Sequence, residues 1–190
     1  YDFHLSMVGG GEMEEEVKRM ISEKGLAREV TLCGYLQPAQ VREMMERMQV
    51  YLFTSDYKEG WGAVLNEAMN SGCAVLASHA IGAVPFLLSH GENGLIFESG
   101  SLKDMGEKAE RLLKSPEERR KLGRAACETI LGEWNAELAA NRLVELAGKV
   151  LEADKRNTVR KADEMAYASG PLSAAEVIAP GKMYRYLIGD

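Results

Sequence analysis

Two glutamates eight residues apart, Glu59 and Glu67, are of a type and spacing that could do chemistry. They flank a short stretch, residues 60 to 63, that carries no charge. We expect a helix over residues 61 to 71, with Glu59 just before it and Glu67 nearly two turns inside it. The helical rise then separates the two carboxylates by roughly 10 Å along the axis.

This separation is a poor match to a glycosidase pair, whose carboxyls lie about 5–9.5 Å apart on either side of one bond. Two separate contacts along an extended ligand fit better, with backbone amides between them. The free N–H groups of an uncharged helix start could approach a diphosphate or a sugar oxygen. A glycine at position 62 costs about 1 kcal/mol relative to alanine, which favours close ligand approach. A purely structural turn and a solvated Glu67 remain the alternatives.

A second glycine-rich turn, residues 9 to 11, could also cradle a phosphate. The helix expected after it, residues 12 to 24, begins with acidic side chains at positions 12, 14, 15 and 16. These acids suit the helix dipole but repel a bound anion. We therefore interpret this segment as a tight turn leading into a well-capped helix.

Strand-like and helix-like segments alternate along the chain. Apolar runs predict strands at 3–8, 30–34, 50–55, 74–78 and 94–97. Further helices are expected over 38–47 and after the cap residues Ser101, Ser115 and Asn135. This alternation predicts an α/β fold, a Rossmann-like doubly wound parallel sheet covered on both faces. We assign residues 1–153 to this domain and 154–190 to a C-terminal tail.

Composition narrows the function. The 190 residues are 46% hydrophobic and carry a formal charge of −6, which argues against a nucleic-acid partner. We expect no membrane span, no metal site and reduced, buried cysteines in a cytoplasmic protein. His79, just beyond a strand end, is a candidate ligand contact. A basic helix face is expected to be a solvated surface, with contact to an anionic membrane as the alternative; it comprises Lys114, Arg119, Arg120, Lys121 and Arg124.

Residues 3 to 146 resemble the C-terminal, donor-binding domain of the GT-B glycosyltransferases, in particular the large retaining family 4. The main carrier is EGWGAVLNEAMNSGCAVLAS, residues 59 to 78, which is similar to the family's E-x7-E motif. Four supporting pieces occur in the family's order: MVGGG, VTLCGYLQPAQVREMM, VYLFTS and IGAVPFLLSHGENGLIF. The resemblance implies that the sheet is the C-terminal half of a GT-B fold.

The resemblance also implies a role for each site residue. Glu67 would bind the ribose hydroxyls of a nucleotide-sugar. Glu59 would lie at the hydroxyls of the donor sugar, acting electrostatically in catalysis and not as a general base. The sugar and diphosphate would contact the backbone of Gly60, Trp61, Gly62 and Ala63, and the base would be flanked by Gly34, Tyr35 and Leu36. No metal or other cofactor is implied, because basic residues and a helix dipole hold the leaving diphosphate.

Three positions depart from the family pattern and leave sugar selectivity open. Phe86 stands where the family has glutamate, Ala74 where it has proline, and Ala83 where it has a second glycine. The family's phosphate-binding Arg and Lys, and its acceptor-binding N-terminal domain, precede the segment that matches Phe3. We therefore expect an N-terminally truncated domain that lacks its first strand and helix.

Together these features predict the donor-binding part of a cytoplasmic enzyme of polysaccharide biosynthesis. It would transfer a hexosyl group, with retention, from a UDP- or GDP-sugar to a glycan, lipid or small-molecule acceptor held by the N-terminal domain. A peripheral membrane contact of the whole protein is a further expectation. Alone, this chain would bind donor weakly and transfer nothing. The alternatives are a non-catalytic GT-B-like binding module, disfavoured by intact Glu59 and Glu67, and a UDP-sugar 2-epimerase-like enzyme, disfavoured by the E-x7-E element.

Overall fold

The computed structural model describes residues 1–155, with side chains through residue 151. Its centre is a parallel sheet of β3 (Val50–Phe53), β4 (Ala74–Ser78) and β5 (Leu95–Phe97), with β4 in the middle. Phe53 pairs with Ala77 on one side of β4, and Ser78 pairs with Phe97 on the other. The carboxyl ends of all three strands therefore meet at one edge.

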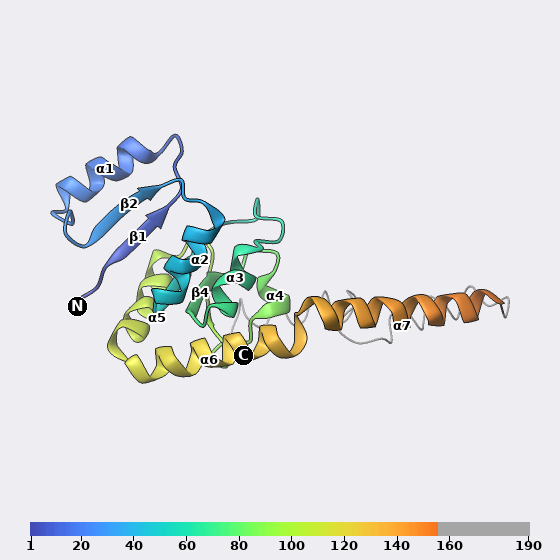
Figure 1. The fold of residues 1–190 in the computed structure, drawn as a ribbon. Coiled ribbons are helices and arrows are strands. Elements are labelled where there is room, and N and C mark those ends of the chain that lie inside the picture. Colours follow the sequence, from blue (N-terminus) through green and yellow to red (C-terminus); the bar gives the residue numbers. More distant parts are fainter. Residues whose placement is uncertain (156–190) are drawn as a thin grey trace.

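Helices cover both faces of this sheet (Figure 1). Val75 and Ala77 of β4 belong to a core shared with α2 (Pro38–Arg47), α3 (Val64–Asn70) and α6 (Pro116–Glu133). Ala74 and Leu76 belong to a second core, shared with α5 (Leu102–Lys114). Every residue of β4 is buried, as expected for a strand covered on both sides.

β1 (Leu5–Val8) and β2 (Val30–Gly34) form a separate two-stranded parallel sheet beside α1 (Glu14–Glu23) (Figure 1). Three apolar residues of β1, Leu5, Met7 and Val8, are 37 to 43% exposed. The predicted fold class is confirmed, but the strands form two parallel sheets instead of one. Among the described residues no strand pairs with both sheets, so β1 and β3 each keep one edge without a strand partner.

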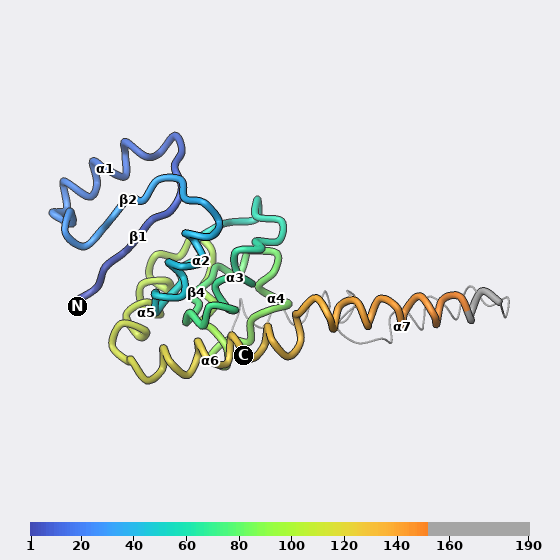
Figure 2. The backbone as a smooth tube through the Cα atoms, in the orientation of Figure 1, coloured from blue at the N-terminus to red at the C-terminus, as the bar shows by residue number. Residues whose placement is uncertain are grey.

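Three predicted helix starts are confirmed by their caps. Ser101 Oγ accepts from the Asp104 N–H, and Ser115 Oγ accepts from the Glu118 N–H, with proline following at N1. The Asn135 side chain likewise accepts from the Leu138 N–H and opens α7 (Ala136–Lys155). α7 leaves the body of the molecule, as the backbone trace shows (Figure 2).

Several sequence-based expectations need correction. α3 begins at Val64, not at residue 61, and a short helix, α4 (Val84–Leu87), was not predicted. Cys73 is buried as expected, whereas Cys33 and Cys127 are only half-buried; all three are free. Residues 154 and 155 end α7, and the rest of the predicted tail lies outside the described residues. In the part of the chain that is described, no helix is both long and apolar enough to cross a bilayer.

Candidate functional site

The loop between β3 and α3 carries the predicted site. Gly62 has a φ of +83°, which explains why α3 starts two residues later. A Cβ on Gly62 would lie 2.8 Å from the Phe53 ring and 3.1 Å from Ile81, so a side chain does not fit. Glycine is therefore needed at position 62 by the protein's own packing and backbone, and its presence is not evidence of close ligand approach.

A second loop, which follows β4, fixes the backbone of the first. The Gly82 N–H donates to the Glu59 carbonyl at 3.3 Å, and the Ala83 N–H donates to the Trp61 carbonyl at 2.9 Å. These bonds join the loop after β3 to the loop after β4. The site loop is thus held in place before any ligand binds.

Five consecutive backbone N–H groups, those of residues 60 to 64, have no hydrogen-bond acceptor within the described part of the chain. A Cβ on Gly60 would meet no atom within 4 Å, so the space beside this residue is open. Because α3 has only seven residues, we assign the capacity to bind an oxygen-rich ligand to these individual N–H groups and not to a helix dipole.

The two carboxylates flank these N–H groups in the sequence. Glu59 is half-buried and Glu67 is exposed on α3. Neither forms an ion pair or accepts a side-chain hydrogen bond from another described residue. Both carboxylates raise the pKa of the Tyr51 hydroxyl, which is about 12. Burial is the largest cause, followed by the charges of Glu67, Cys73 and Glu59. Glu59 and Glu67 therefore lie close enough to Tyr51 for their charges to act on its hydroxyl.

Trp61 is anchored by its side chain. Its indole Nε1–H donates to Asn66 Oδ1 at 3.2 Å. Its ring packs 5.4 Å from Phe86 and 6.0 Å from Trp134, measured between centroids. Phe86, one of the departures from the family pattern, thus packs on the site loop. No sequence pattern indicated this aromatic cluster, because nothing in the spacing of its three members links them.

The residues predicted to flank a base lie at the end of β2, in the two-stranded sheet. Gly34 ends β2 with a φ of +61°, and its carbonyl accepts from the Gly9 N–H at 2.7 Å. The Tyr35 hydroxyl donates to the Gly10 carbonyl at 2.9 Å, while the Tyr35 side chain is 83% exposed. The glycine-rich turn is thus tied to Gly34 and Tyr35. The helix after it, α1, has no side-chain cap, contrary to expectation.

The two groups of predicted site residues lie toward the same side of the molecule. The carboxyl ends of β1 and β2 point to the upper right of the view, and the teal loop between β3 and α3 lies to the right of them (Figure 1). Among the described residues, however, no hydrogen bond joins Gly34, Tyr35 or Leu36 to the loop that contains Glu59. The structure brings Glu59 to Ala63 and Glu67 together, and it leaves the base-flanking residues in the separate lobe.

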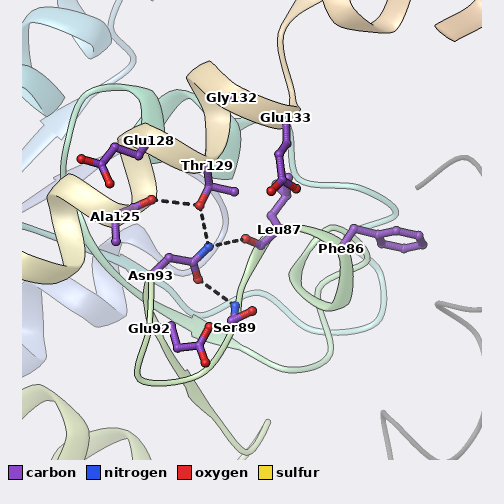
Figure 3. Close-up of a pocket in the computed structure, with 10 residues that line it drawn as sticks. All are labelled: Phe86, Leu87, Ser89, Glu92, Asn93, Ala125, Glu128, Thr129, Gly132 and Glu133. Atoms are coloured by element: carbon purple, nitrogen blue, oxygen red, sulfur yellow. Dashed lines mark hydrogen bonds between the residues drawn. The ribbon is translucent and has the colours of Figure 1, made fainter. Parts of the chain in front are cut away.

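A hollow of about 440 Å³ lies elsewhere, between α6 and the segment joining α4 to β5 (Figure 3). At its centre the buried Asn93 donates to the Leu87 carbonyl and to Thr129 Oγ1, and accepts from the Ser89 N–H. The hollow is also lined by the exposed carboxylates of Glu92, Glu128 and Glu133. None of the predicted site residues lines it, although Phe86, which packs against Trp61, is one of its lining residues.

Comparison with known proteins identifies the family. The model of the family described as "Glycosyl transferases group 1" matches residues 1–129. The chain belongs to this family. The match confirms the resemblance and includes the loop with Glu59, Glu67 and the free N–H groups.

Two group 1 relatives show how much of a whole enzyme this chain represents. It is 26% identical over 158 residues to the N-acetyl-alpha-D-glucosaminyl L-malate synthase of Bacillus anthracis, covering 83% of the chain and 40% of that relative. It is 28% identical over 144 residues to a poly(ribitol-phosphate) alpha-N-acetylglucosaminyltransferase of Staphylococcus aureus, covering 76% of the chain and 28% of that relative. The chain therefore spans less than half of these enzymes.

Solved structures confirm the fold. The C-terminal domain of the group 1 glycosyltransferase LpcC from Francisella tularensis matches with a TM-score of 0.61 at 24% identity, over 66% of this chain and 64% of that one. Anabaena Alr3699/HepE in complex with UDP matches with a TM-score of 0.67 at 21% identity, over 77% of this chain and 41% of that one. The described domain is thus a Rossmann-like C-terminal domain of GT-B type.

Structure adds three residues to the site that sequence patterns did not single out: Tyr51, Ile81 and Gly82. Gly82 had a signal, since it is the retained glycine in the IGAVP stretch. Tyr51 and Ile81 are ordinary apolar positions of a strand and a loop. Tyr51 lies near Glu67 and Ile81 lies against Gly62, and both relationships follow only from the packing.

Proposed function

We propose that this domain binds the donor of a retaining hexosyltransferase, a hexose linked to UDP or GDP. The observation that carries the proposal is the run of five N–H groups between two carboxylates, none of which has a hydrogen-bond or ion-pair partner among the described residues. A nucleotide-sugar has complementary chemistry. Its diphosphate and sugar oxygens accept hydrogen bonds, and hydroxyls at both ends of the molecule donate them.

In this proposal Glu67 accepts from the ribose hydroxyls, while the N–H groups of residues 60 to 64 hold the diphosphate and the near edge of the sugar. Glu59 accepts hydrogen bonds from hydroxyls of the donor hexose. Its negative charge stabilises the positive charge that develops on the sugar ring as the bond to the diphosphate breaks. The exposed Tyr35 and its neighbours Gly34 and Leu36 flank the base. None of these roles requires a metal ion.

Relatives support the choice of ligand. HepE structures contain UDP, UDP-glucose, or UDP with glucose, and a structure of S. aureus TarM contains UDP. TarM matches this chain at 26% identity with a TM-score of 0.66 over 75% of the chain. The acceptor, a glycan, lipid or small molecule, would be held by an N-terminal domain of the whole protein, which would act in the cytoplasm or at a membrane surface.

We also propose that a further strand completes the sheet. Support comes from the open edges of β1 and β3 and from the exposed apolar side chains of β1. A parallel strand between the two sheets would bond both edges. It would also hold the base-flanking residues in a fixed position relative to the loop with Glu59.

Calorimetric titration of residues 1–190 with UDP, GDP and their hexose derivatives tests the function. We expect weak binding, and Glu67→Ala should reduce the affinity about tenfold or more, the loss typical of a hydrogen bond to a charged group. Glu128→Ala, which removes another exposed helix carboxylate outside the site, is the matched control. Equal binding by the Glu67→Ala variant and the original chain would overturn the assignment. Binding of donor by a whole protein that transfers no sugar would favour the non-catalytic module.

A further inference from the structure

His79 follows β4, the middle strand of the sheet, at the edge where the site lies. Its Nδ1 accepts a hydrogen bond from the Ser99 N–H at 3.0 Å. A backbone N–H can only donate, so Nδ1 must carry a lone pair. The neutral ring therefore carries its proton on Nε2, which makes Nε2–H a hydrogen-bond donor of fixed tautomer.

The position of Ser99 indicates where this donor is directed. Ser99 lies just beyond β5, on one side of β4, and β3 lies on the other. Because the two nitrogens of an imidazole point in different directions, Nε2–H is directed away from Ser99. Tyr57, in the loop after β3, packs against the His79 ring, 6.3 Å away between centroids and nearly perpendicular at 81°. Among the described residues, Nε2 has no hydrogen-bond partner.

His79 is thus one of the residues through which the loop after β4 contacts the loop after β3. Tyr57 packs on His79, the Glu59 carbonyl bonds Gly82, and the Trp61 carbonyl bonds Ala83. The two paired loops carry side chains of opposite hydrogen-bonding chemistry. The Glu59 carboxylate can only accept hydrogen bonds, and His79 Nε2–H can only donate. A sugar hydroxyl, which both donates and accepts, is the group that uses such a pair fully.

We propose that His79 is a specificity-determining residue that contacts the donor hexose. Its Nε2–H donates to a hydroxyl oxygen of the sugar held by Glu59, and the Ser99 N–H fixes the tautomer that makes this possible. The inference rests on the proposed function and adds a residue to its sugar-binding end. It explains why a histidine that is bonded on one side keeps an unused donor on the other.

The tautomer is tested directly, without ligand. Long-range ¹H–¹⁵N spectra of the ¹⁵N-labelled chain distinguish a protonated Nε2 from a protonated Nδ1, and a His79→Ala variant assigns the signals. We expect a neutral His79 ring with its proton on Nε2 at pH 7.5. A ring protonated on Nδ1, or on both nitrogens, would overturn the inference.

Two variants separate a sugar contact from a structural role. In His79→Asn, the side-chain oxygen can replace Nδ1 as the acceptor for Ser99 N–H, but no donor reaches the Nε2 position. In His79→Gln, the amide N–H₂ can replace Nε2–H, but no acceptor remains for Ser99. Calorimetry measures the affinity ratio of a UDP-hexose to UDP, using whichever of UDP-glucose, UDP-galactose and UDP-N-acetylglucosamine gives the largest ratio. We expect His79→Asn to lower this ratio about three- to tenfold with UDP affinity unchanged, and His79→Gln to preserve it.

The outcomes distinguish this inference from the proposed function. If His79 only caps Ser99, then His79→Asn behaves like the original chain and His79→Gln loses thermal stability without a selective loss of hexose affinity; only the inference then fails. It also fails if UDP binding depends on Glu67 but no UDP-hexose binds more tightly than UDP. If neither nucleotides nor nucleotide-sugars bind, the proposed function fails and the inference fails with it.

Discussion

A Cβ atom on Gly82 would lie 1.8 Å from the carbonyl oxygen of Gly60. The loops that follow β3 and β4 are therefore in direct backbone contact at this point. The same loops are joined by hydrogen bonds on either side, from Gly82 to Glu59 and from Ala83 to Trp61. The position of the free N–H groups thus depends on a glycine in a different loop.

Gly82→Ala should disrupt the site through the protein's own packing. A backbone carbonyl cannot rotate away as a long side chain can, so the loop with Gly60 must shift. We expect a loss of about 1–3 kcal/mol in the free energy of unfolding, the range for an overpacked interior, and a loss of UDP binding. Urea denaturation followed by circular dichroism measures the first, and calorimetry the second.

Gly60→Ala is the matched control. Its Cβ would enter open space, and Gly60 does not have the positive φ of Gly62. The free energy of unfolding should change by no more than about 0.5 kcal/mol, as for ordinary surface substitutions. Binding of a UDP-hexose should still weaken, because the new methyl group occupies space where we place the ligand. A Gly60→Ala variant that is stable and binds normally would show that the ligand lies elsewhere.

Glu59 and Glu67 should affect different parts of the same ligand. Glu59→Gln preserves the shape of the side chain and removes its charge. We expect it to leave UDP affinity unchanged and to reduce the additional affinity that the hexose provides about tenfold. Glu67→Gln should weaken UDP and UDP-hexose by the same factor, because both contain the ribose. Parallel titrations with the two ligands check this, and equal losses for both ligands in both variants would contradict the assignment of two ends.

Local sequence patterns predicted the strands and most helices of this fold well, because periodicity and caps are local properties. Pro38 opens α2, and Ser101, Ser115 and Asn135 cap helices as expected. The start of α3 could not be predicted in this way. The helix-like sequence after Gly60 gives no sign that position 62 lies against Phe53 and Ile81 and has a positive φ.

For the same reason, the sequence allowed only part of the candidate site to be proposed. Glu59 and Glu67 could be recognised because they lie in one contiguous motif. The hydrogen bonds between loops could not be recognised, because the partners of Gly82, His79 and Tyr35 are distant in sequence and meet only when the strands pair. The division into two sheets also depends on which strands find neighbours, and no local pattern records that.

Amide hydrogen exchange should divide the chain into two parts. β4 is fully buried between β3 and β5, so its amides should exchange only through large-scale unfolding. β1 pairs on one edge only, and its apolar side chains are largely exposed. We expect the β1 and β2 amides to exchange much faster than those of β4, as measured by mass spectrometry. A longer chain that supplies the proposed strand should slow β1 selectively, and uniform protection of both sheets in residues 1–190 would contradict the proposal.

Tyr51 should report the charge of the site through its ionisation. Burial disfavours the phenolate, and Glu67, Cys73 and Glu59 disfavour it further, so the pKa of Tyr51 is about 12 in place of the usual 10. At a pH between these two pKa values, Tyr51 keeps its proton in the folded protein and has lost it in the unfolded chain. Stability should therefore decline as the pH rises from 10 to 12.

Selective ¹³C labelling of tyrosine, with Tyr51→Phe to assign the signal, measures the pKa of Tyr51. Glu67→Gln should lower it more than Glu59→Gln does, and Glu128→Gln should leave it unchanged. If neither of the first two variants moved the Tyr51 signal, the two carboxylates would not lie around this phenol.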